Sequence, residues 1–252
     1  MVKIIMHGCN GKMGQVISQL LKEDKQAEIV AGIDLFDNRE NGYPVFTNIW
    51  DCNIKADAVI DFASSKATDA LLDYCIRREL PVVVCTTGLS EEQLWNISET
   101  SKKVAVLRSA NMSLGVNMLL KLLQSAAKVL APAGFDMEIV EKHHKHKVDA
   151  PSGTAIAMAE SLNGALDNAY TFNFDRSHER KAREENEIGV VAVRGGSIVG
   201  EHDVIFAGTD EVVTFSHTAY SKVIFAKGAI QAAKFLAGKP AGLYGMSDVI
   251  DI

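Results

Sequence analysis

Short apolar runs alternate with amphipathic stretches from the N-terminus to about position 110 of the chain. The runs have the length of β-strands, and the stretches between them carry apolar residues at the spacing of a helix face. This alternation is typical of repeated βαβ units, which form a parallel sheet, so we predict an α/β domain. Its strands are predicted at residues 3–6, 28–33, 58–62, 81–85 and 104–108, and its helices at 12–22, 67–77 and 91–102, the last with Ser90 as N-cap.

The pattern changes after one further helix, and the strands that follow it from residue 136 onward predict a second domain. A helix with one apolar face is expected over residues 114–129, closed by Ala-Pro-Ala-Gly at 131–134. Three of the apolar runs that follow are joined by short polar turns, which predicts an antiparallel sheet and an α+β domain. The helix face comprises Leu119, Leu122, Leu123, Ala126 and Leu130; strands are predicted at 137–140, 188–193, 203–207 and 212–217, and further helices at 154–162 and 222–236.

The composition is that of an ordinary globular protein of 252 residues. Hydrophobic residues make up 47% and charged residues 23%, and the formal net charge is -6. No run approaches the roughly 18 apolar residues of a membrane span, and the N-terminal apolar run is too short for a secretory signal. The four cysteines, at positions 9, 52, 75 and 85, show no CxxC spacing, which argues against a zinc site and a disulfide framework. We expect a cytoplasmic protein with reduced thiols and neither a nucleic-acid nor a membrane partner.

Residues 175–187 form a dense run of mixed charge between two predicted strands. Such runs usually form solvated loops, and this is the first interpretation. The second interpretation is that an Arg of this run helps to close over an acidic substrate.

Three glycines follow the first predicted strand, where the next helix begins. Gly8, Gly11 and Gly14 can provide a tight turn, a close approach of the backbone to a pyrophosphate, and close packing of helix on strand. The G-x-x-G-x-x-G spacing is weak by itself, and a structural turn that is rich in glycine is the alternative. Asp34 stands at the end of the second strand, at the distance from the glycines at which an acid can bind both hydroxyls of an adenosine ribose. Together these features predict a nicotinamide dinucleotide site.

Two later loops also follow predicted strands of this domain. Residues 85–88, Cys-Thr-Thr-Gly, offer hydroxyl and amide groups, and residues 109–115 offer an Asn side chain and a turn of small residues. Open α/β sheets bind ligands at the carboxyl ends of their strands. The residues alone leave open whether these loops contact a ligand or only cap the helices that follow them.

Residues 141–154 place three histidines and three lysines ahead of a Pro-Ser-Gly-Thr turn in an otherwise acidic chain. Histidine exchanges protons near neutral pH, lysine supplies positive charge, and the turn offers amides at a predicted helix start, so we predict an anion site. A metal site, against which the interleaved lysines argue, and a surface patch without chemistry are the alternatives. Strand alternation would separate His143 and Lys145 from His144 and His146. We therefore predict that the strand ends by about His143 and that a loop follows.

Taken together, these motifs resemble the signature of the 4-hydroxy-tetrahydrodipicolinate reductase (dihydrodipicolinate reductase) family of the diaminopimelate and lysine pathway. The resemblance implies a Rossmann-type dinucleotide-binding domain, residues 1–114 plus 222–252, and an α+β domain, residues 115–221, that binds substrate and forms a homotetramer. It also implies hydride transfer from a reduced nicotinamide to a cyclic imine dicarboxylate, followed by protonation. The stretches that carry it are GCNGKMG at 8–14, TTG at 86–88, NMSLGVN at 111–117, EKHHKHKVDAPSGTA at 141–155, RGGSIVGEHDV at 194–204 and LYGMSDVI at 243–250.

The resemblance further implies roles for individual residues. His143 and Lys147 are the expected acid/base pair, and no metal is expected. The expected substrate contacts are His144, Ser152, Gly153 and Thr154, and the expected cofactor contacts are Gly8, Cys9, Asn10, Gly11, Lys12, Met13, Asp34, Cys85, Thr86, Thr87, Ser109, Ala110, Asn111 and Met112.

The chain departs from the family pattern at positions that bear on the cofactor. Leu35 stands directly after the ribose-binding acid, where members that accept a 2′-phosphate commonly have Arg. We therefore predict a preference for NADH, with NADPH still possible through Lys12. Met112 replaces a common aromatic residue and Cys85 a common Gly, which is tolerable where the neighbouring backbone makes the contacts.

Two other functions remain as alternatives. A semialdehyde or sugar dehydrogenase can share the two-domain layout, but the former requires a Cys nucleophile paired with His, and no Cys lies outside the predicted nucleotide domain. A dinucleotide-sensing protein would bind the cofactor without turnover.

Overall fold

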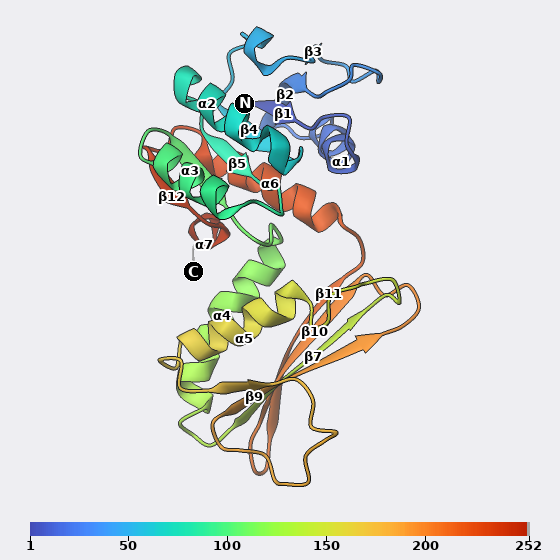
Figure 1. Cartoon of the computed structure of the whole chain (residues 1–252), viewed down its shortest axis with the longest axis vertical. Helices are drawn as coiled ribbons and strands as arrows, with labels where there is room; N and C mark the ends of the chain where they lie inside the picture. The colour runs from blue at the N-terminus through green and yellow to red at the C-terminus, as the bar shows by residue number, and fades with distance from the viewer. Residues whose placement is uncertain (251–252) are drawn as a thin grey trace. The chain divides into compact units, whose positions relative to one another are not determined.

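The computed structural model describes residues 1–250, which divide into two compact units (Figure 1). The first unit comprises residues 1–114 and the segment that begins at Val223, and the second comprises Gly115–Lys222. The expected domain bounds differ from this division only in the placement of Lys222, and residues 251 and 252 of the expected first domain lie outside the described residues. No helix within residues 1–250 is long and apolar enough to cross a membrane.

A parallel sheet of seven strands forms the centre of the first unit, with the order β12-β6-β5-β4-β1-β2-β3. The order reverses between β1 and β4. Sheets of this kind bind ligands outside the carboxyl ends of the strands at such a switch point. The strands are β1 (Val2–His7), β2 (Ala27–Ile33), β3 (Val45–Phe46), β4 (Ala58–Asp61), β5 (Val82–Val84), β6 (Ala105–Arg108) and β12 (Gly242–Tyr244).

Helices pack on both faces of this sheet, so its central strands are buried on both sides. Ile4 of β1 packs in one apolar cluster with residues of α1 and α6, and Ile5 packs in a second cluster with residues of α2 and α3. Burial on both faces explains why the strands read as continuous apolar runs. The helices are α1 (Lys12–Leu21), α2 (Thr68–Arg78), α3 (Glu91–Ser101), α6 (Val223–Leu236) and α7 (Met246–Val249), with 3-10 turns η1 (Ile49–Asp51) and η2 (Ser65–Ala67).

The strands and helices predicted up to position 110 are confirmed. The predicted N-cap of α3 is confirmed as well: the Ser90 hydroxyl accepts a hydrogen bond from the Gln93 N–H at 3.2 Å, and the Gln93 side chain accepts one from the Ser90 N–H. The short edge strands β3 and β12 were not predicted, because neither is fully buried and neither carries the continuous apolar run of the central strands.

A mixed sheet of five strands forms the second unit, with the order β11-β10-β7-β9-β8. β10 is antiparallel to β7 and β11, whereas β9 is parallel to β7 and β8. The elements are α4 (Leu114–Leu130), β7 (Asp136–His143), α5 (Gly153–Gly164), β8 (Thr171–Asn173), β9 (Glu187–Arg194), β10 (Gly200–Ala207) and β11 (Val212–Ala219).

The prediction of an antiparallel sheet is therefore wrong for half of this unit. β7 lies between β9 and β10, so the runs at 188–193 and 203–207 are not neighbours. A short polar turn shows that the chain reverses direction, but it does not determine which strand lies beside which.

One face of the second sheet packs against α4 and α5. The buried positions of α4 are Val116, Leu119, Leu123 and Ala127. Leu122 was predicted on this face but is 39% exposed, because it lies about 100° around the helix from Leu123. The apolar stripe of α4 is thus narrower than the sequence suggested.

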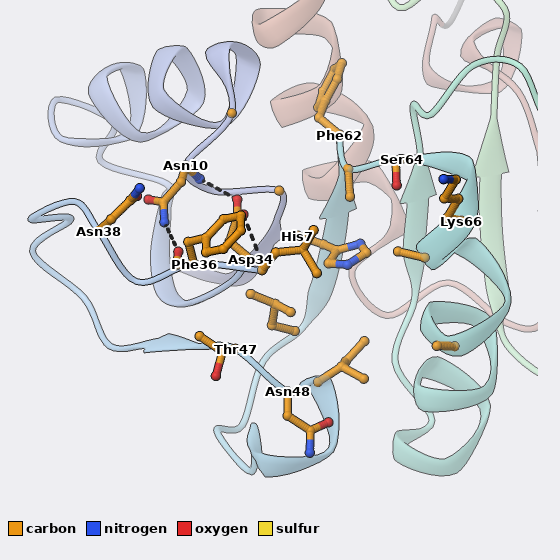
Figure 2. A pocket seen from close by; sticks show the side chains of 18 of the residues that line it. His7, Asn10, Asp34, Phe36, Asn38, Thr47, Asn48, Phe62, Ser64 and Lys66 are labelled. Carbon is orange, nitrogen blue, oxygen red and sulfur yellow. Dashed lines mark hydrogen bonds between the residues drawn. The ribbon is translucent and has the colours of Figure 1, made fainter.

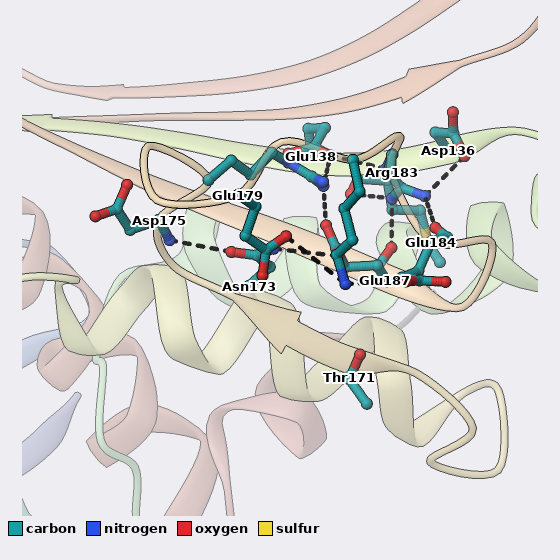
Figure 3. A network of polar contacts seen from close by, with 12 residues as sticks. Asp136, Glu138, Thr171, Asn173, Asp175, Glu179, Arg183, Glu184 and Glu187 are labelled. Atoms are coloured by element: carbon teal, nitrogen blue, oxygen red, sulfur yellow. Dashed lines mark hydrogen bonds and ion pairs between the residues drawn. The ribbon is translucent and has the colours of Figure 1, made fainter.

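The charged run at 175–187 is not a wholly solvated loop, because two of its three arginines contact carboxylates of the sheet (Figure 3). Arg183 donates to Glu138 at 2.9 Å and to Asp136 at 2.8 Å, both on β7. Arg176 pairs with Glu138 and with Glu187 of β9. These contacts tie the loop to the sheet, so closure of either Arg over a substrate would require it to leave carboxylate partners.

Candidate active site

The glycine loop between β1 and α1 is tightly packed. Gly8 has φ +81°, and a Cβ there would lie 2.7 Å from the carbonyl oxygen of Phe62. A Cβ on Gly14 would lie 2.2 Å from the carbonyl oxygen of Gly8. Gly11 is the N-cap of α1 and brings no capping side chain, so the first amides of this helix face the loop without a side-chain acceptor from that position. The loop therefore has the form of a backbone cradle for an anion.

Asp34 follows β2 beside this cradle, and its carboxylate is fixed by two backbone amides (Figure 2). One oxygen accepts a hydrogen bond from the Asn10 N–H and the other accepts one from the Leu35 N–H, both at 2.8 Å. The side chain of Asn10 in turn donates to the carbonyl oxygen of Phe36. A cavity of about 900 Å³ opens here, lined among others by Gly8, Gly11, Asp34, Arg39, Trp50 and Lys66.

The other residues predicted around this site differ in how exposed their side chains are. Cys9 is fully buried, and burial, followed by the charge of Asp34, raises the pKa of its thiol to about 12. Met13 packs against the apolar core, whereas Lys12 is exposed on the first turn of α1. Contacts from Cys9 are therefore limited to its backbone groups.

The loop after β5 is held by a buried polar network that sequence reasoning missed. The Thr86 hydroxyl donates to one oxygen of Asp61 at 2.7 Å, and His7 Nδ1 lies 2.8 Å from the other. The Cys85 thiol is buried, which raises its pKa well above the ordinary value, and Thr87 is exposed. The hydroxyl of Thr86 is thus already engaged, and the network joins the carboxyl ends of β1, β4 and β5.

The loop after β6 closes on itself. The Ser109 hydroxyl donates to the Asn111 carbonyl oxygen at 2.8 Å, and the Asn111 side chain accepts from the Ser113 N–H at 2.9 Å. Met112 is 4% exposed and belongs to the apolar core, while Ala110 is exposed. In this loop, the backbone of the turn and the Asn111 side chain are therefore available for ligand contact. The buried side chain of Met112 is not available.

In the second unit, β7 ends at His143 and a turn follows, as predicted. Lys147 Nζ donates to both oxygens of Asp149 at 2.8 Å. The hydrogen bonds from Lys147, followed by weaker contributions that include the backbone of Gly153 at the start of α5, lower the pKa of Asp149. One carboxylate thus already lies between the lysine ammonium group and the N-terminus of a helix.

Ser152 was predicted to contact substrate, but its polar groups are engaged inside the unit. Its hydroxyl accepts from the Ala155 N–H at 3.2 Å and lies 3.0 Å from His202 Nε2. Its N–H donates to Glu141 at 2.9 Å, and the residue is 2% exposed. These contacts make Ser152 the N-cap of α5, a role that positions the neighbouring Gly153 and Thr154.

A buried carboxylate lies next to His143. Glu141 Oε2 is 2.6 Å from His143 Nδ1, and Arg194 of β9 donates to both oxygens of Glu141 at 2.7 and 2.8 Å. Burial by itself raises the pKa of Glu141, but hydrogen bonds from Arg194, His143 and the Ser152 N–H outweigh it and lower the pKa below its ordinary value. Glu141 and His143 share one face of a strand, so the sequence did contain a signal for this pair. It contained none for Arg194.

His202 of β10 should give the protein a pH-dependent stability. Burial, followed by the charge of His143, lowers the pKa of His202 from 6.5 to about 4. As the pH falls, His202 is therefore protonated in the unfolded chain before it is protonated in the folded one. The contribution of the neutral His202 to the free energy of unfolding is complete above pH 6.5 and is lost as the pH falls towards 4. This difference between the two pKa values of His202 corresponds to roughly 3 kcal/mol of unfolding free energy.

We expect His202→Gln to show a smaller decrease in unfolding free energy between pH 6.5 and 4 than wild type in urea denaturation. His178→Gln, at an exposed histidine, is the control; equal decreases in wild type and His202→Gln would contradict this assignment.

The histidines do not assemble a metal site in the part of the chain that the structure describes. Within residues 1–250, no three His, Cys, Asp or Glu side chains come together in a way that could hold a metal ion. The Nδ1 atoms of His144 and His202 are buried and have no hydrogen-bond partner among these residues. A polar ligand could supply partners for such atoms.

Comparison with known proteins identifies relatives along the whole chain. The family model for the dihydrodipicolinate reductase N-terminus matches residues 2–112, and that for the C-terminus matches residues 115–250. The 4-hydroxy-tetrahydrodipicolinate reductase of Caldanaerobacter subterraneus subsp. tengcongensis is 50% identical over 250 residues, covering 99% of this chain and 98% of the relative. That of Clostridium novyi is 49% identical with the same coverage.

Solved structures share the fold. A dipicolinate-bound dihydrodipicolinate reductase from Paenisporosarcina sp. TG-14 matches with a TM-score of 0.83 and 23% identity, over 99% of this chain and all of that one. A myo-inositol 2-dehydrogenase from Lactobacillus plantarum matches with a TM-score of 0.58 and 11% identity, over 93% of this chain and 88% of that one. At these identities the likeness concerns the fold alone.

Proposed function

Since the chain belongs to the dihydrodipicolinate reductase family and is a reductase of 4-hydroxy-tetrahydrodipicolinate in lysine and diaminopimelate biosynthesis, we propose that the turn after β7 binds and protonates the substrate. One observation carries this assignment of the site. The Asp149 carboxylate lies between the Lys147 ammonium group and the backbone of Gly153, which is the arrangement that a substrate carboxylate requires.

The substrate is a cyclic dicarboxylate, and we assign its recognition to four residues. Lys147 and the N-terminus of α5, at Gly153 and Thr154, bind one carboxylate in the place that Asp149 occupies. His144 supplies a buried Nδ1 atom without a partner among residues 1–250, which fits a contact with the same ligand. Asp149 is exposed and can turn away to solvent when the substrate arrives.

Dipicolinate provides the test of this assignment, because the Paenisporosarcina neighbour is in complex with it. We expect dipicolinate to bind this protein and to compete with substrate. Thr154→Val keeps the shape of the side chain and removes its hydroxyl, so it should weaken binding roughly tenfold or more, as for a hydrogen bond to a charged group. Thr171→Val, at the exposed first residue of β8, is the matched control. Equal affinities of wild type and Thr154→Val in calorimetry would contradict the role of Thr154.

Protonation is assigned to His143 and Lys147. The bound dinucleotide supplies the hydride, which leaves a neighbouring ring carbon of the substrate electron-rich. His143 directs Nδ1 at Glu141, so Nε2 is the ring nitrogen that exchanges a proton. Lys147 carries a proton on Nζ next to the carboxylate position. The two residues form the acid/base pair that completes the reduction.

The first unit fits a nicotinamide dinucleotide. A Cβ at Gly8 or Gly14 would collide with backbone atoms, so the loop closes tightly ahead of the N-terminus of α1, where the pyrophosphate is placed. Asp34 is the ribose ligand. The turns after β5 and β6 are assigned to the nicotinamide end, through backbone groups at Cys85, Thr86, Thr87, Ser109, Ala110 and Met112 and the side chain of Asn111.

We propose that NADH is preferred to NADPH. The Asp34 carboxylate is held by two backbone amides, so it cannot turn away from the charge of a 2′-phosphate, and Leu35 offers no compensating cation. Arg39 lines the cavity, and the exposed Lys12 directly follows Gly11, which also lines it. These two cations can still attract a 2′-phosphate, so NADPH is expected to be a poorer cofactor and not an excluded one. The measure is the ratio of kcat/KM for the two cofactors, which should favour NADH.

We also propose a cytoplasmic homotetramer. The four cysteines are free thiols, which suits a reducing compartment. Helices α4 and α5 cover one face of the second sheet, and the other face exposes Val191 (48%) and Val193 (43%) of β9. Exposed neighbouring valines on a sheet face favour burial between copies of the chain. Light scattering coupled to size-exclusion chromatography tests the assembly.

The semialdehyde dehydrogenase alternative lacks a reactive Cys nucleophile among the residues that the structure describes. The cysteines at positions 9, 52, 75 and 85 are buried, and burial raises the pKa of the Cys9 and Cys85 thiols, so these remain protonated near neutral pH. A dinucleotide sensor without turnover would tolerate His143→Ala and Lys147→Ala with no loss, which separates it from the proposed reductase.

A further inference from the structure

The carboxylate of Glu141 is saturated with hydrogen-bond donors although it is completely buried. His143 Nδ1 lies 2.6 Å from Oε2, and the Ser152 N–H donates to Oε1 at 2.9 Å. Arg194 donates one hydrogen bond to each oxygen, at 2.8 and 2.7 Å. Four donors from three different segments therefore converge on one side chain, which none of the roles assigned above requires.

We propose that Glu141 is the positioning residue of His143: it holds the imidazole in one orientation and keeps the neutral ring protonated on Nδ1, so that Nε2 is the nitrogen that exchanges a proton. This inference rests on the role proposed for His143. An ionised carboxylate only accepts hydrogen bonds, so the His143 atom that faces it must be a donor. A carboxylate behind a histidine fixes its tautomer and orientation in the same way in serine proteases.

Arg194 and Ser152 explain how Glu141 can do this in the interior. A buried carboxylate without partners would take up a proton and then donate a hydrogen bond, which would reverse the tautomer of the histidine. The bidentate guanidinium of Arg194 keeps Glu141 ionised and prevents rotation of its carboxylate. Because the Ser152 N–H also contacts Glu141, the same carboxylate ties the end of β7 to the start of α5. It thereby holds the two halves of the proposed substrate site together.

Gly200 at the start of β10 leaves room beside the other nitrogen of the imidazole. A Cβ built on Gly200 would lie 3.0 Å from His143 Nε2. Any larger residue would therefore crowd the nitrogen that is proposed to exchange the proton. His202, further along β10, stacks edge-on against His143 with ring centroids 5.1 Å apart. The ring of His143 is thus confined by Glu141, Gly200 and His202.

Glu141→Gln tests the proposal, with Glu138→Gln as the matched control. An amide has one acceptor oxygen and cannot serve four donors, and its NH₂ group can donate to His143 Nδ1 and so select the opposite tautomer. We expect kcat to fall about 100-fold or more, with a change in NADH affinity of less than about threefold. Glu138 lies on the same strand, faces the other side of the sheet and also contacts two arginines, so Glu138→Gln should keep kcat within about threefold.

A measurement on the wild-type protein keeps the proposal testable if Glu141→Gln does not fold. The ¹⁵N chemical shifts of His143 in the neutral state distinguish the two tautomers, and the proton is expected on Nδ1. A proton on Nε2, or a folded Glu141→Gln protein with wild-type kcat, would overturn the inference. If His143→Gln also kept wild-type kcat, the proposed function of His143 itself would fail. Loss of activity in His143→Gln together with full activity in Glu141→Gln would overturn only the role of Glu141.

Discussion

Lys147→Met is expected to lower kcat by about 10²–10⁴-fold, the range for loss of a positioned acid or base. The substitution removes the ammonium group that lies 2.8 Å from both Asp149 oxygens and keeps most of the side-chain volume. Substrate KM should rise as well, because the same group is proposed to bind a carboxylate. NADH affinity should not change, since the glycine loop and Asp34 belong to the other unit. Steady-state kinetics and NADH titration by fluorescence separate these effects.

Lys145→Met is the matched control for that variant. Lys145 lies earlier in the same turn, its side chain is exposed, and its described hydrogen bond is a backbone contact to Gly196. We expect its kcat to stay within about twofold of wild type, as for an exposed substitution away from the site. Equal losses in the two variants would mean that the general positive charge of the turn is responsible, and would contradict a specific role for Lys147.

Gly14→Ala is expected to weaken cofactor binding and to destabilise the first unit. The added Cβ would lie 2.2 Å from the Gly8 carbonyl oxygen and 2.7 Å from Cys9 Cα. Both neighbours are backbone atoms, so relief requires displacement of the loop or of α1. Overpacking of this kind costs about 1–3 kcal/mol and occasionally more. Thermal unfolding should show a lower Tm, and NADH titration should show at least a roughly tenfold weaker affinity, because the displaced loop no longer fits the pyrophosphate.

Gly164→Ala is the corresponding control. Gly164 is the last residue of α5, and a Cβ there would meet nothing within 4 Å. Alanine in a helix is about 1 kcal/mol more favourable than glycine, so the control should unfold at an equal or higher temperature and bind NADH like wild type. Wild-type NADH affinity in Gly14→Ala would contradict the placement of the cofactor on this loop.

The first unit could be predicted almost completely from the sequence, because its central strands are buried on both faces and read as apolar runs, and its helices are long enough to show their period. The edge strands β3 and β12 are not fully buried, and their positions depend on neighbouring strands and not on a local pattern. In the second unit the strands themselves were found, but their order was not. β7 ends at His143 and β9 begins only at Glu187, yet β7 lies between β9 and β10, and no local signal records such a pairing.

The candidate site divides in the same way. The end of β7 at His143 could be predicted, because alternation would otherwise have separated the histidines, and the pairing of Glu141 with His143 follows from their alternate positions on the strand. Arg194 and His202 could not be predicted, since they reach Glu141 and Ser152 only through the register of β9 and β10 with β7. Sequence patterns also cannot show that a hydroxyl is already engaged, as that of Ser152 is with the Ala155 N–H.

The rate of nicotinamide oxidation with enzymatically generated 4-hydroxy-tetrahydrodipicolinate, followed by absorbance, tests the central claim most directly. The assay is run with NADH and then with NADPH on the full chain, and without substrate as the blank. We predict substrate-dependent oxidation with a higher kcat/KM for NADH. A higher kcat/KM for NADPH would contradict the interpretation of Asp34 and Leu35, and no oxidation of either cofactor would contradict the assignment as a reductase.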